Sequence, residues 1–225
     1  GADIGILYTS SSENAIVLEQ ELRKNGKAFT FKANLKDPES TRLLFKEAVD
    51  ELNEVSILVN CAATASQSMC DFDDLTDDLW GTTQKINVQA PLILTQEFAK
   101  QGISGSIINI SSIEAKQPAK GHTHYSVSKS ALEALTKASA TELGSLGIRV
   151  NGIAPGPTLK NKRQSKKHFR KQYLATPLKQ QVNVDEICKA VKFFIENGSI
   201  TGQILAVDSG QSLNWQTPDI MGGKE

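Results

Sequence analysis

The sequence is poor in cysteine, and its few cysteines are not arranged as a structural framework would require. It contains Cys61, Cys70 and Cys188, an odd number in which no two have the spacing of a metal site. Neither a disulfide framework nor a structural zinc site is therefore expected. Reduced cysteines are typical of cytoplasmic proteins, and we expect that location for this chain.

Long apolar runs and an excess of one charge are also missing. No apolar run approaches the roughly 18 residues that a membrane-spanning helix needs, so we expect no membrane partner. The 25 basic residues balance the 25 acidic ones, which removes any global attraction to nucleic acid. With 39% apolar residues and no net charge, the chain is also unlike a disordered protein.

Short apolar runs alternate with longer stretches of helical periodicity. This pattern predicts strands at residues 4–8, 28–33, 56–60, 106–110, 148–153 and 203–207, and helices at 14–24, 38–52, 78–100, 124–146 and 184–196. Strands that are apolar on both faces are typical of a parallel sheet covered by helices on both sides. We therefore predict an α/β protein in which residues 1–225 form a single doubly wound, Rossmann-like domain.

One segment departs from this alternation. Residues 160–171 carry seven lysines and arginines and no acidic residue. One interpretation is a solvated helical insertion. The other is a basic flap, at about 159–178, that covers the active site and attracts an anionic cofactor or substrate. Nucleic-acid binding is less favoured, because only Phe169 and Tyr173 interleave the charges.

Tyr125 and Lys129 form a candidate catalytic pair. Residues four apart on a helix share one face, so the phenol and the ammonium can point into the same cleft. A nearby cation favours the phenolate and lowers the pKa of a tyrosine, which makes it a usable general acid or base.

Polar and small residues follow several of the predicted strands, where an open parallel sheet binds its ligands. Ser111 and Ser112 come directly after one apolar strand, and Ser112 could hold a carbonyl oxygen there. Asn60, Cys61 and Ala62 end another strand with little bulk, which would allow a flat ligand to approach. Asn87 lies in the long helix, where a buried amide needs a hydrogen-bonding partner.

These motifs, in this order, resemble the short-chain dehydrogenase/reductase family over nearly the whole chain. Asn60-Cys61-Ala62-Ala63 is similar to the family's Asn-Asn-Ala-Gly motif, with two departures. Ser112 matches the catalytic serine, Tyr125 and Lys129 match Tyr-x-x-x-Lys, and Asn87 matches the helix asparagine. Residues 150–156 match the strand that leads to Pro-Gly, and 201–210 resemble the family's final strand, with Ser209 replacing a usual glycine.

The resemblance implies hydride transfer between a nicotinamide and a carbon that bears oxygen or nitrogen. Tyr125 would give or take the proton, and Lys129 would lower its pKa and hold the ribose. Ser112 would position the substrate oxygen, and Asn87 would fix a water in a proton relay. The cofactor-binding residues that the resemblance implies are Tyr8, Thr9, Ser10, Asn34, Leu35, Asn60, Cys61, Ala62, Tyr125, Lys129, Pro155, Gly156 and Thr158.

The family's first segment has no counterpart in this sequence. Its members begin with a strand and a Thr-Gly-x-x-x-Gly-x-Gly loop that holds the pyrophosphate at a helix N-terminus. Gly1 and Ala2 match the family just before its second strand, so about thirty residues of strand, loop and helix are expected to precede them. Without that segment, the sheet would lack its central strand and cofactor binding would be in doubt.

The choice of cofactor is expected to follow from the end of the strand at 4–8. NAD enzymes place an acidic residue there to bind the ribose 2′-hydroxyl. In this sequence, Tyr8 is followed by Thr9, Ser10, Ser11 and Ser12, with no acid before Glu13. Hydroxyl groups can accept a 2′-phosphate, so NADP(H) is favoured and NAD(H) remains possible.

Several substrates and one non-catalytic role remain open. Residues 155–159 and 176–178 resemble bacterial pteridine reductases, which reduce a ring C=N bond, although many of these have aspartate where Ser112 lies. The alternatives are a 3-oxoacyl carrier-protein reductase, whose acidic carrier the basic flap could meet, and a truncated family member that acts as a binding or scaffold protein. The resemblance also implies self-association as a homotetramer or homodimer, through the helices that contain Asn87 and Tyr125 and through the last helix and strand.

Overall fold

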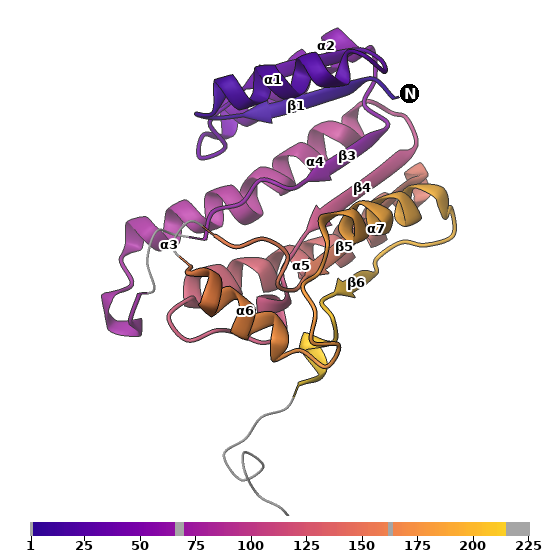
Figure 1. The fold of residues 1–225 in the computed structure, drawn as a ribbon. Helices are drawn as coiled ribbons and strands as arrows, with labels where there is room; N and C mark the ends of the chain where they lie inside the picture. The colour runs from indigo at the N-terminus through magenta and orange to yellow at the C-terminus, as the bar shows by residue number, and fades with distance from the viewer. Residues whose placement is uncertain (1, 66–69, 162–163, 215–225) are drawn as a thin grey trace, which may run out of the picture.

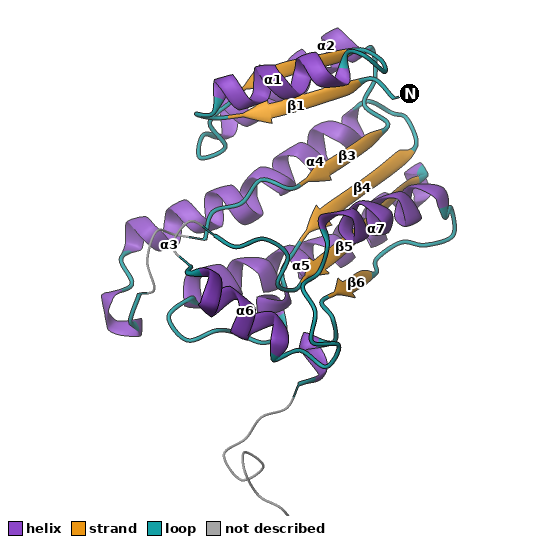
Figure 2. Ribbon diagram, viewed as in Figure 1, coloured by secondary structure: helices purple, strands orange, loops and turns teal. Residues whose placement is uncertain are grey.

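The strands run parallel and fall into two groups in the computed structural model, which describes residues 2–65, 70–161 and 164–214. The first group pairs β1 (Ile4–Tyr8) with β2 (Ala28–Lys32). The second has the order β3 (Ile57–Asn60), β4 (Gly105–Ile110), β5 (Ile148–Pro155) and β6 (Ile204–Val207). Figure 2 shows both groups of strands, with helices packed beside each of them. The α/β architecture expected from the sequence is therefore confirmed.

Helices cover both faces of the four-stranded sheet. The main core cluster joins β4 and β5 to α2 (Pro38–Leu52), α4 (Ala90–Lys100) and α5 (Thr123–Leu143). A smaller cluster lies on the opposite face, where α7 (Val184–Glu196) packs against Ile108 and Ile153. Alternate residues of a strand point to opposite faces, which is why Ile107 belongs to the first cluster and Ile108 to the second. In the other strand group, α1 (Ser12–Leu22) connects β1 to β2 along the chain and contacts both strands.

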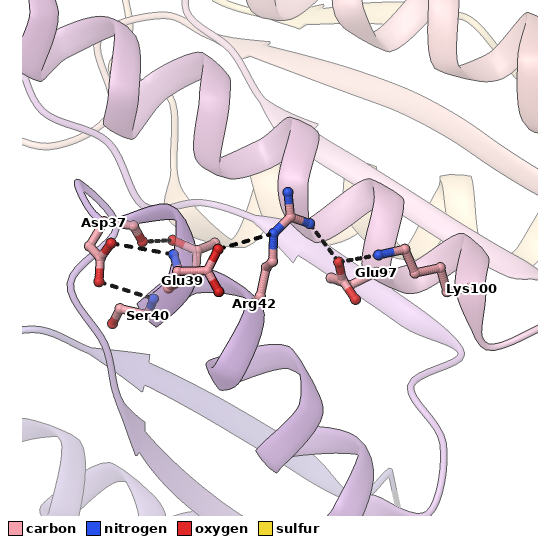
Figure 3. A network of polar contacts seen from close by, with 7 residues as sticks. Asp37, Glu39, Ser40, Arg42, Glu97 and Lys100 are labelled. Carbon is pink, nitrogen blue, oxygen red and sulfur yellow. Dashed lines mark hydrogen bonds and ion pairs between the residues drawn. The ribbon is translucent and has the colours of Figure 1, made fainter.

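An ion-pair network also joins α2 to α4 (Figure 3). The Arg42 guanidinium donates to the Glu97 carboxylate at 2.7 Å, and the Lys100 ammonium donates to the same oxygen at 2.7 Å. At the start of α2, the Asp37 carboxylate accepts from the backbone N–H of Glu39 and Ser40. This is an N-terminal cap, and Pro38 suits the first helical turn because it lacks an N–H.

The helix expected over residues 78–100 is interrupted in its middle. It consists of α3 (Asp77–Gln84), a π-helical turn at Lys85–Gln89, and α4. Asn87 lies in the π-helical turn with its side chain buried. Such turns are rare in proteins overall, and those that occur are often at functional sites. Hydrophobic periodicity cannot reveal this turn, because one extra residue in a helix changes the pattern very little.

A wide gap separates β1 from β3 (Figure 1). It contains a cavity of about 720 Å³, lined by β1, β3 and the apolar side chains of α2 and α4, among them Leu44, Phe45 and Leu94. In the described part of the chain, no strand lies between β1 and β3. That a central strand belongs in this gap stays a prediction.

The basic segment is partly helical, as its composition suggested. α6 (Lys166–Leu174) begins after Ser165, whose hydroxyl accepts the backbone N–H of His168 at 3.0 Å. Phe169 is buried and forms an edge-to-face contact with Tyr173. Residues 162 and 163, which belong to the same segment, lie outside the described residues. In the remainder, no helix is both long and apolar enough to cross a membrane.

Candidate active site

The carboxyl ends of β3 and β4 are joined by a chain of buried amides. Asn60 and Asn109 are register partners. The Asn60 side-chain amide donates to the side-chain oxygen Oδ1 of Asn109 at 2.8 Å. Asn109 donates in turn to the Thr136 hydroxyl of α5 at 2.8 Å. Asn60, which was expected to bind the cofactor, therefore turns its side chain to the next strand. Its neighbours Cys61 and Ala62 are exposed at the end of the cavity.

Ser112 and Tyr125 lie together, as the sequence predicts. Ser112 follows β4, and its hydroxyl accepts the backbone N–H of Glu114 at 3.2 Å at the start of a 3₁₀ turn, Ile113–Ala115. Tyr125 lies in the first turns of α5, which packs against this 3₁₀ turn. A hydrogen bond from Ser112 contributes to the environment of the phenol. The two hydroxyl groups therefore meet beyond the end of β4.

The pKa of the Tyr125 phenol is raised above its ordinary value, mainly by burial. The hydrogen bond with Ser112 acts to lower this pKa, and the negative charge of Glu114 acts to raise it. The sequence predicts the opposite direction, with the Lys129 ammonium as the cause, and the structure corrects that prediction. Lys129 donates to the backbone carbonyl of Ile110 at 2.7 Å, so its charge is directed at β4 and away from the phenol.

Lys129 shares a face of α5 with Tyr125 and is almost completely buried. Its ammonium lies 5.7 Å from the centre of the Tyr125 ring. Burial lowers the pKa of Lys129 to about 8, and the nearby Cys61 side chain opposes this shift. The predicted juxtaposition of residues 112, 125 and 129 is therefore present, while the pKa of the Tyr125 phenol is shifted in the direction opposite to the expected one.

Asn87 connects the segment after β3 to α5. Its side-chain oxygen accepts the backbone N–H of Thr64 at 2.8 Å, and its amide donates to the Thr64 carbonyl at 2.8 Å and to the Ser128 hydroxyl at 2.9 Å. These contacts use both N–H groups of the buried amide and one of the two lone pairs of its oxygen. The expected role of Asn87 in a proton relay is not visible in them and stays a prediction.

The residues after β1 and β2 lie at the edge of the other strand group. The Thr9 hydroxyl donates to the Ala33 carbonyl at 2.9 Å. Ser10 is exposed and follows Tyr8, the last residue of β1, by two positions. Asn34 is exposed, and its side-chain oxygen accepts the backbone N–H of Lys36 at 3.2 Å. The Leu35 side chain belongs to the core, so only its backbone could contact a ligand.

The end of β5 is shaped by a close approach of two chain segments. A Cβ atom at Gly156 would lie 2.6 Å from the Cα atom of Asp208, so no other residue fits there without displacing the backbone. Pro155 ends the strand, and the Thr158 hydroxyl donates to the Gly156 carbonyl at 3.1 Å. Of the residues predicted here, Thr158 therefore directs its side chain to the backbone of Gly156.

Sequence reasoning missed four residues around this site. Ser128 is the partner of Asn87, and Glu114 contacts both His122 and Ser126. Ser128 could have been found from its place one helical turn after Tyr125. Glu114 could have been found from its place two residues after Ser112. The contact with His122 depends on the turn between β4 and α5, which the sequence pattern does not specify.

Comparisons with known proteins agree with this geometry. A family model described as enoyl-(acyl carrier protein) reductase matches residues 1–212. The 3-oxoacyl-[acyl-carrier-protein] reductase FabG of Staphylococcus aureus is 29% identical, over 95% of this chain and 89% of that protein. An L-rhamnose 1-dehydrogenase (NADP(+)) from Thermoplasma acidophilum is 32% identical, over 96% of this chain and 89% of that protein.

A solved structure gives the same result at the level of the fold. The crystal structure of FolM alternative dihydrofolate reductase 1 from Brucella canis, complexed with NADP, superposes with a TM-score of 0.91. The two sequences are 32% identical, and the match covers 98% of this chain and 88% of the other. With its serine, tyrosine and lysine gathered at the carboxyl edge of a parallel sheet, this chain belongs to the short-chain dehydrogenase/reductase family of oxidoreductases.

Proposed function

We propose that the protein is an NADP(H)-dependent reductase of a small carbonyl or pterin-like C=N compound, with Tyr125 as its general acid. The observation that carries this proposal is the meeting of Ser112, Tyr125 and Lys129 beyond β4. The Lys129 ammonium lies 5.7 Å from the Tyr125 ring, and the Ser112 hydroxyl hydrogen-bonds with the phenol. A buried lysine beside a tyrosine at the ligand-binding edge of a parallel sheet is typical of a functional site.

A nicotinamide held by these residues would supply the hydride for the substrate carbon. The Tyr125 phenol then donates its proton to the substrate oxygen or nitrogen, and Ser112 orients that atom through its hydroxyl. The resulting phenolate would be reprotonated from solvent, and Lys129, whose ammonium lies 5.7 Å from the centre of the ring, would hold the nicotinamide ribose. Each turnover thus adds one hydride and one proton to the double bond.

The residues after β1 fit a phosphorylated ribose. Ser10, Ser11 and Ser12 are exposed, and Ser11 makes no capping hydrogen bond with its side chain at the start of α1. The first N–H groups of this helix are therefore available to an anion. The NADP named in several similar structures and relatives supports the same cofactor. The remaining contacts would come from Tyr125, Lys129 and the segments at residues 60–62 and 155–158.

We also propose that cofactor binding requires a further parallel strand in the gap between β1 and β3. In a parallel ladder, alternate residues direct their backbone groups to the same neighbour. The backbone N–H of Ile4 donates to the carbonyl of Lys27, the residue before β2. The carbonyl of Ser56, the residue before β3, accepts the backbone N–H of Ser106 in β4. The backbone groups of Gly5, Leu7, Ile57 and Val59 therefore face the gap.

The side chains beside the gap support the same proposal. Ile57 and Val59 are each 40% exposed, on the face of β3 opposite to α4. An apolar strand in the gap would form backbone hydrogen bonds with both β1 and β3, and a helix following it would cover the side chains of Ile57 and Val59. The strand would end between residues 8–12 and 60–62, where the pyrophosphate of a dinucleotide is expected.

Binding and turnover test the function together. We expect the fluorescence of NADPH to change on titration with the protein extended upstream by a strand and a glycine-rich loop, with weaker binding of NADH. NADPH oxidation should then be followed with dihydrobiopterin, with dihydrofolate and with a soluble 3-oxoacyl thioester, acetoacetyl-coenzyme A. Tyr125→Phe is the matched control, since it should bind NADPH and reduce nothing.

The outcomes separate the alternatives. Turnover of a dihydropterin supports the proposal, and turnover of acetoacetyl-coenzyme A alone would replace it with a 3-oxoacyl reductase. Failure to bind either dinucleotide would support the non-catalytic binding role. If NADPH binds only after the chain is extended upstream with a strand and a glycine-rich loop, the proposed strand site is supported.

The 3-oxoacyl reductase is kept as a second candidate because of α6. Its exposed face carries Lys166, Lys167, Arg170 and Lys171, and this helix contains no acidic residue. Such a face is complementary to an acidic carrier protein. The basic flap at 159–178 would then bind the carrier, and the charge-reversed variant Lys167→Glu should raise KM for a carrier-bound substrate without affecting acetoacetyl-coenzyme A.

Self-association is proposed through the same faces that the family resemblance implies. Large apolar side chains are exposed on α3, α4 and α5 and, separately, on α7 and β6. The two groups are Trp80, Leu92 and Val127, and Val184, Phe193 and Leu205. Two such faces allow a homotetramer, and one alone gives a homodimer. Sedimentation equilibrium of Val127→Glu and Phe193→Glu would show which face is used, and a monomeric parent protein would contradict the proposal.

A further inference from the structure

Glu114 connects the segment that carries Ser112 with the helix that carries Tyr125. Its backbone N–H donates to the Ser112 hydroxyl at 3.2 Å. Its carboxylate accepts the Ser126 hydroxyl at 3.4 Å and lies 3.1 Å from Nδ1 of His122. One residue therefore binds the catalytic serine through its backbone and the first turn of α5 through its side chain.

The carboxylate is held in place and is only partly exposed. The side chains of Glu114 and His122 retain 24% and 28% of their exposure, and Ser126 is buried. A carboxylate with two neighbouring hydrogen-bonding atoms, Nδ1 of His122 and the Ser126 hydroxyl, has little freedom to turn away from the site. Its charge consequently stays at a fixed position beside the Tyr125 phenol, where it acts to raise the pKa of that group.

We propose that Glu114 is a positioning residue of the active site, which fixes Ser112 against α5 and biases the enzyme toward reduction. This inference rests on the proposed reductase function and adds the direction of the reaction to it. Reduction needs a tyrosine that holds its proton until the substrate accepts it, whereas oxidation needs a phenolate. A fixed negative charge beside the phenol disfavours the phenolate and so favours the acid.

Other charged groups around the phenol do not provide this effect. The titratable groups of the surrounding elements are Glu114 on the 3₁₀ turn, Cys61 after β3, His122 at the N-terminal cap of α5, and His124 and Lys129 on α5, and of these only Glu114 contributes to the shifted pKa of the phenol. Lys129 directs its ammonium to the Ile110 carbonyl. His124 is 1% exposed, and burial lowers its pKa, which favours the neutral imidazole. Glu114 is the carboxylate that this arrangement places beside the phenol.

The test compares two variants that each remove one carboxylate. Glu114→Gln keeps a side-chain oxygen that can accept from Ser126 and loses the charge. Glu133→Gln is the matched control, because Glu133 lies on α5 and accepts from Ser111 at 3.1 Å, but its charge does not contribute to the raised pKa of Tyr125. Ionisation of the Tyr125 phenol is measured by ultraviolet absorbance, with Tyr125→Phe subtracted to remove Tyr8 and Tyr173.

In Glu114→Gln we expect the phenol to ionise about half a pH unit to one unit lower than in the parent protein. The alkaline limb of kcat/KM for reduction should move in the same direction, and Glu133→Gln should change neither. A third variant, Ser126→Ala, keeps the charge of Glu114 and removes the hydrogen bond that attaches its carboxylate to α5. It should lower kcat and leave the pH at which the phenol ionises unchanged.

Two results would decide against the inference. If Glu114→Gln is folded by circular dichroism and its phenol ionises as in the parent protein, the charge has no effect and the inference is wrong. If the two variants shift the phenol equally, the effect is not specific to Glu114. A shifted phenol in a protein without any reductase activity would instead overturn the proposed function, so the two failures are distinguishable.

Discussion

The ammonium of Lys129 lies 5.7 Å from the centre of the Tyr125 ring, one helical turn further along α5, and donates to the carbonyl of Ile110. This relationship brings a cation, a phenol and the end of β4 into one place. It also explains why the lysine can be buried, since an ammonium in the interior needs a hydrogen-bond acceptor. The predictions below start from this pair.

Replacement of Tyr125 by phenylalanine should abolish proton donation without changing the shape of the site. We expect kcat for reduction to fall about 10³-fold, because general acid catalysis contributes on this order. The dissociation constant of NADPH, measured by fluorescence, should stay within about threefold of the parent value, since a lost neutral hydrogen bond costs only about 1 kcal/mol. Retention of substantial turnover would show that another group supplies the proton.

Burial of Lys129 makes stability depend on pH in a defined window. Its pKa falls from 10.5 to about 8 on folding, so the unfolded chain binds more protons between these values. The free energy of unfolding should therefore rise as the pH increases from about 8 to 10, by at most about 3 kcal/mol. Urea denaturation of the parent protein and of Lys129→Met should show this rise in the parent alone.

The window ends near pH 10 because Tyr125 acts in the opposite sense. Its pKa is raised on folding, so above its ordinary value the folded state holds a proton that the unfolded state has lost. Stability should fall with further increase of pH for this reason. A parent protein with equal stability at pH 8 and pH 10 would contradict the burial of a titrating lysine.

The contact of Arg42 with Glu97 should stabilise the attachment of α2 to α4 (Figure 3). We expect Glu97→Gln to lower the free energy of unfolding by about 0.5–1 kcal/mol, the usual range for partly exposed ion pairs. Contacts with Lys100 and Arg42 lower the pKa of Glu97, so this contribution is present above the carboxyl's unfolded pKa and is lost as the pH falls through its folded pKa. A double-mutant cycle with Arg42→Met, at low and high salt, measures the pairwise part.

Ser209 offers a stabilising substitution. Its φ angle is 55°, in the left-handed region that favours glycine, and the family resemblance indicates a glycine at this position. Ser209→Gly should raise the free energy of unfolding by about 0.5–1 kcal/mol, because relief of the strained backbone exceeds the added entropy of the unfolded chain. Thermal unfolding of this variant beside Ser212→Gly, a control elsewhere in the same loop, would test the origin of the effect. A decrease in stability would show that the serine makes a compensating contact.

The sequence by itself determined the class of fold and which residues are the candidates for catalysis. The alternation of apolar strands and helical periods predicted a parallel α/β sheet, because these periods follow directly from backbone geometry. The spacing of Tyr125 and Lys129 placed both on one helix face for the same reason. The position of Ser112 after an apolar strand then predicted that it would lie at the carboxyl edge of the sheet.

The tertiary structure alone decided in which direction the pKa values of those residues are shifted and which contacts connect the residues. Whether Lys129 lowers the pKa of Tyr125 depends on where its ammonium finds an acceptor, and it finds one at Ile110. The connection of Ser112 to α5 through Glu114 depends on a turn that no periodic pattern describes. Local sequence sets which backbone geometry is favourable, whereas burial, dielectric environment and long-range contacts exist only after distant segments have packed together.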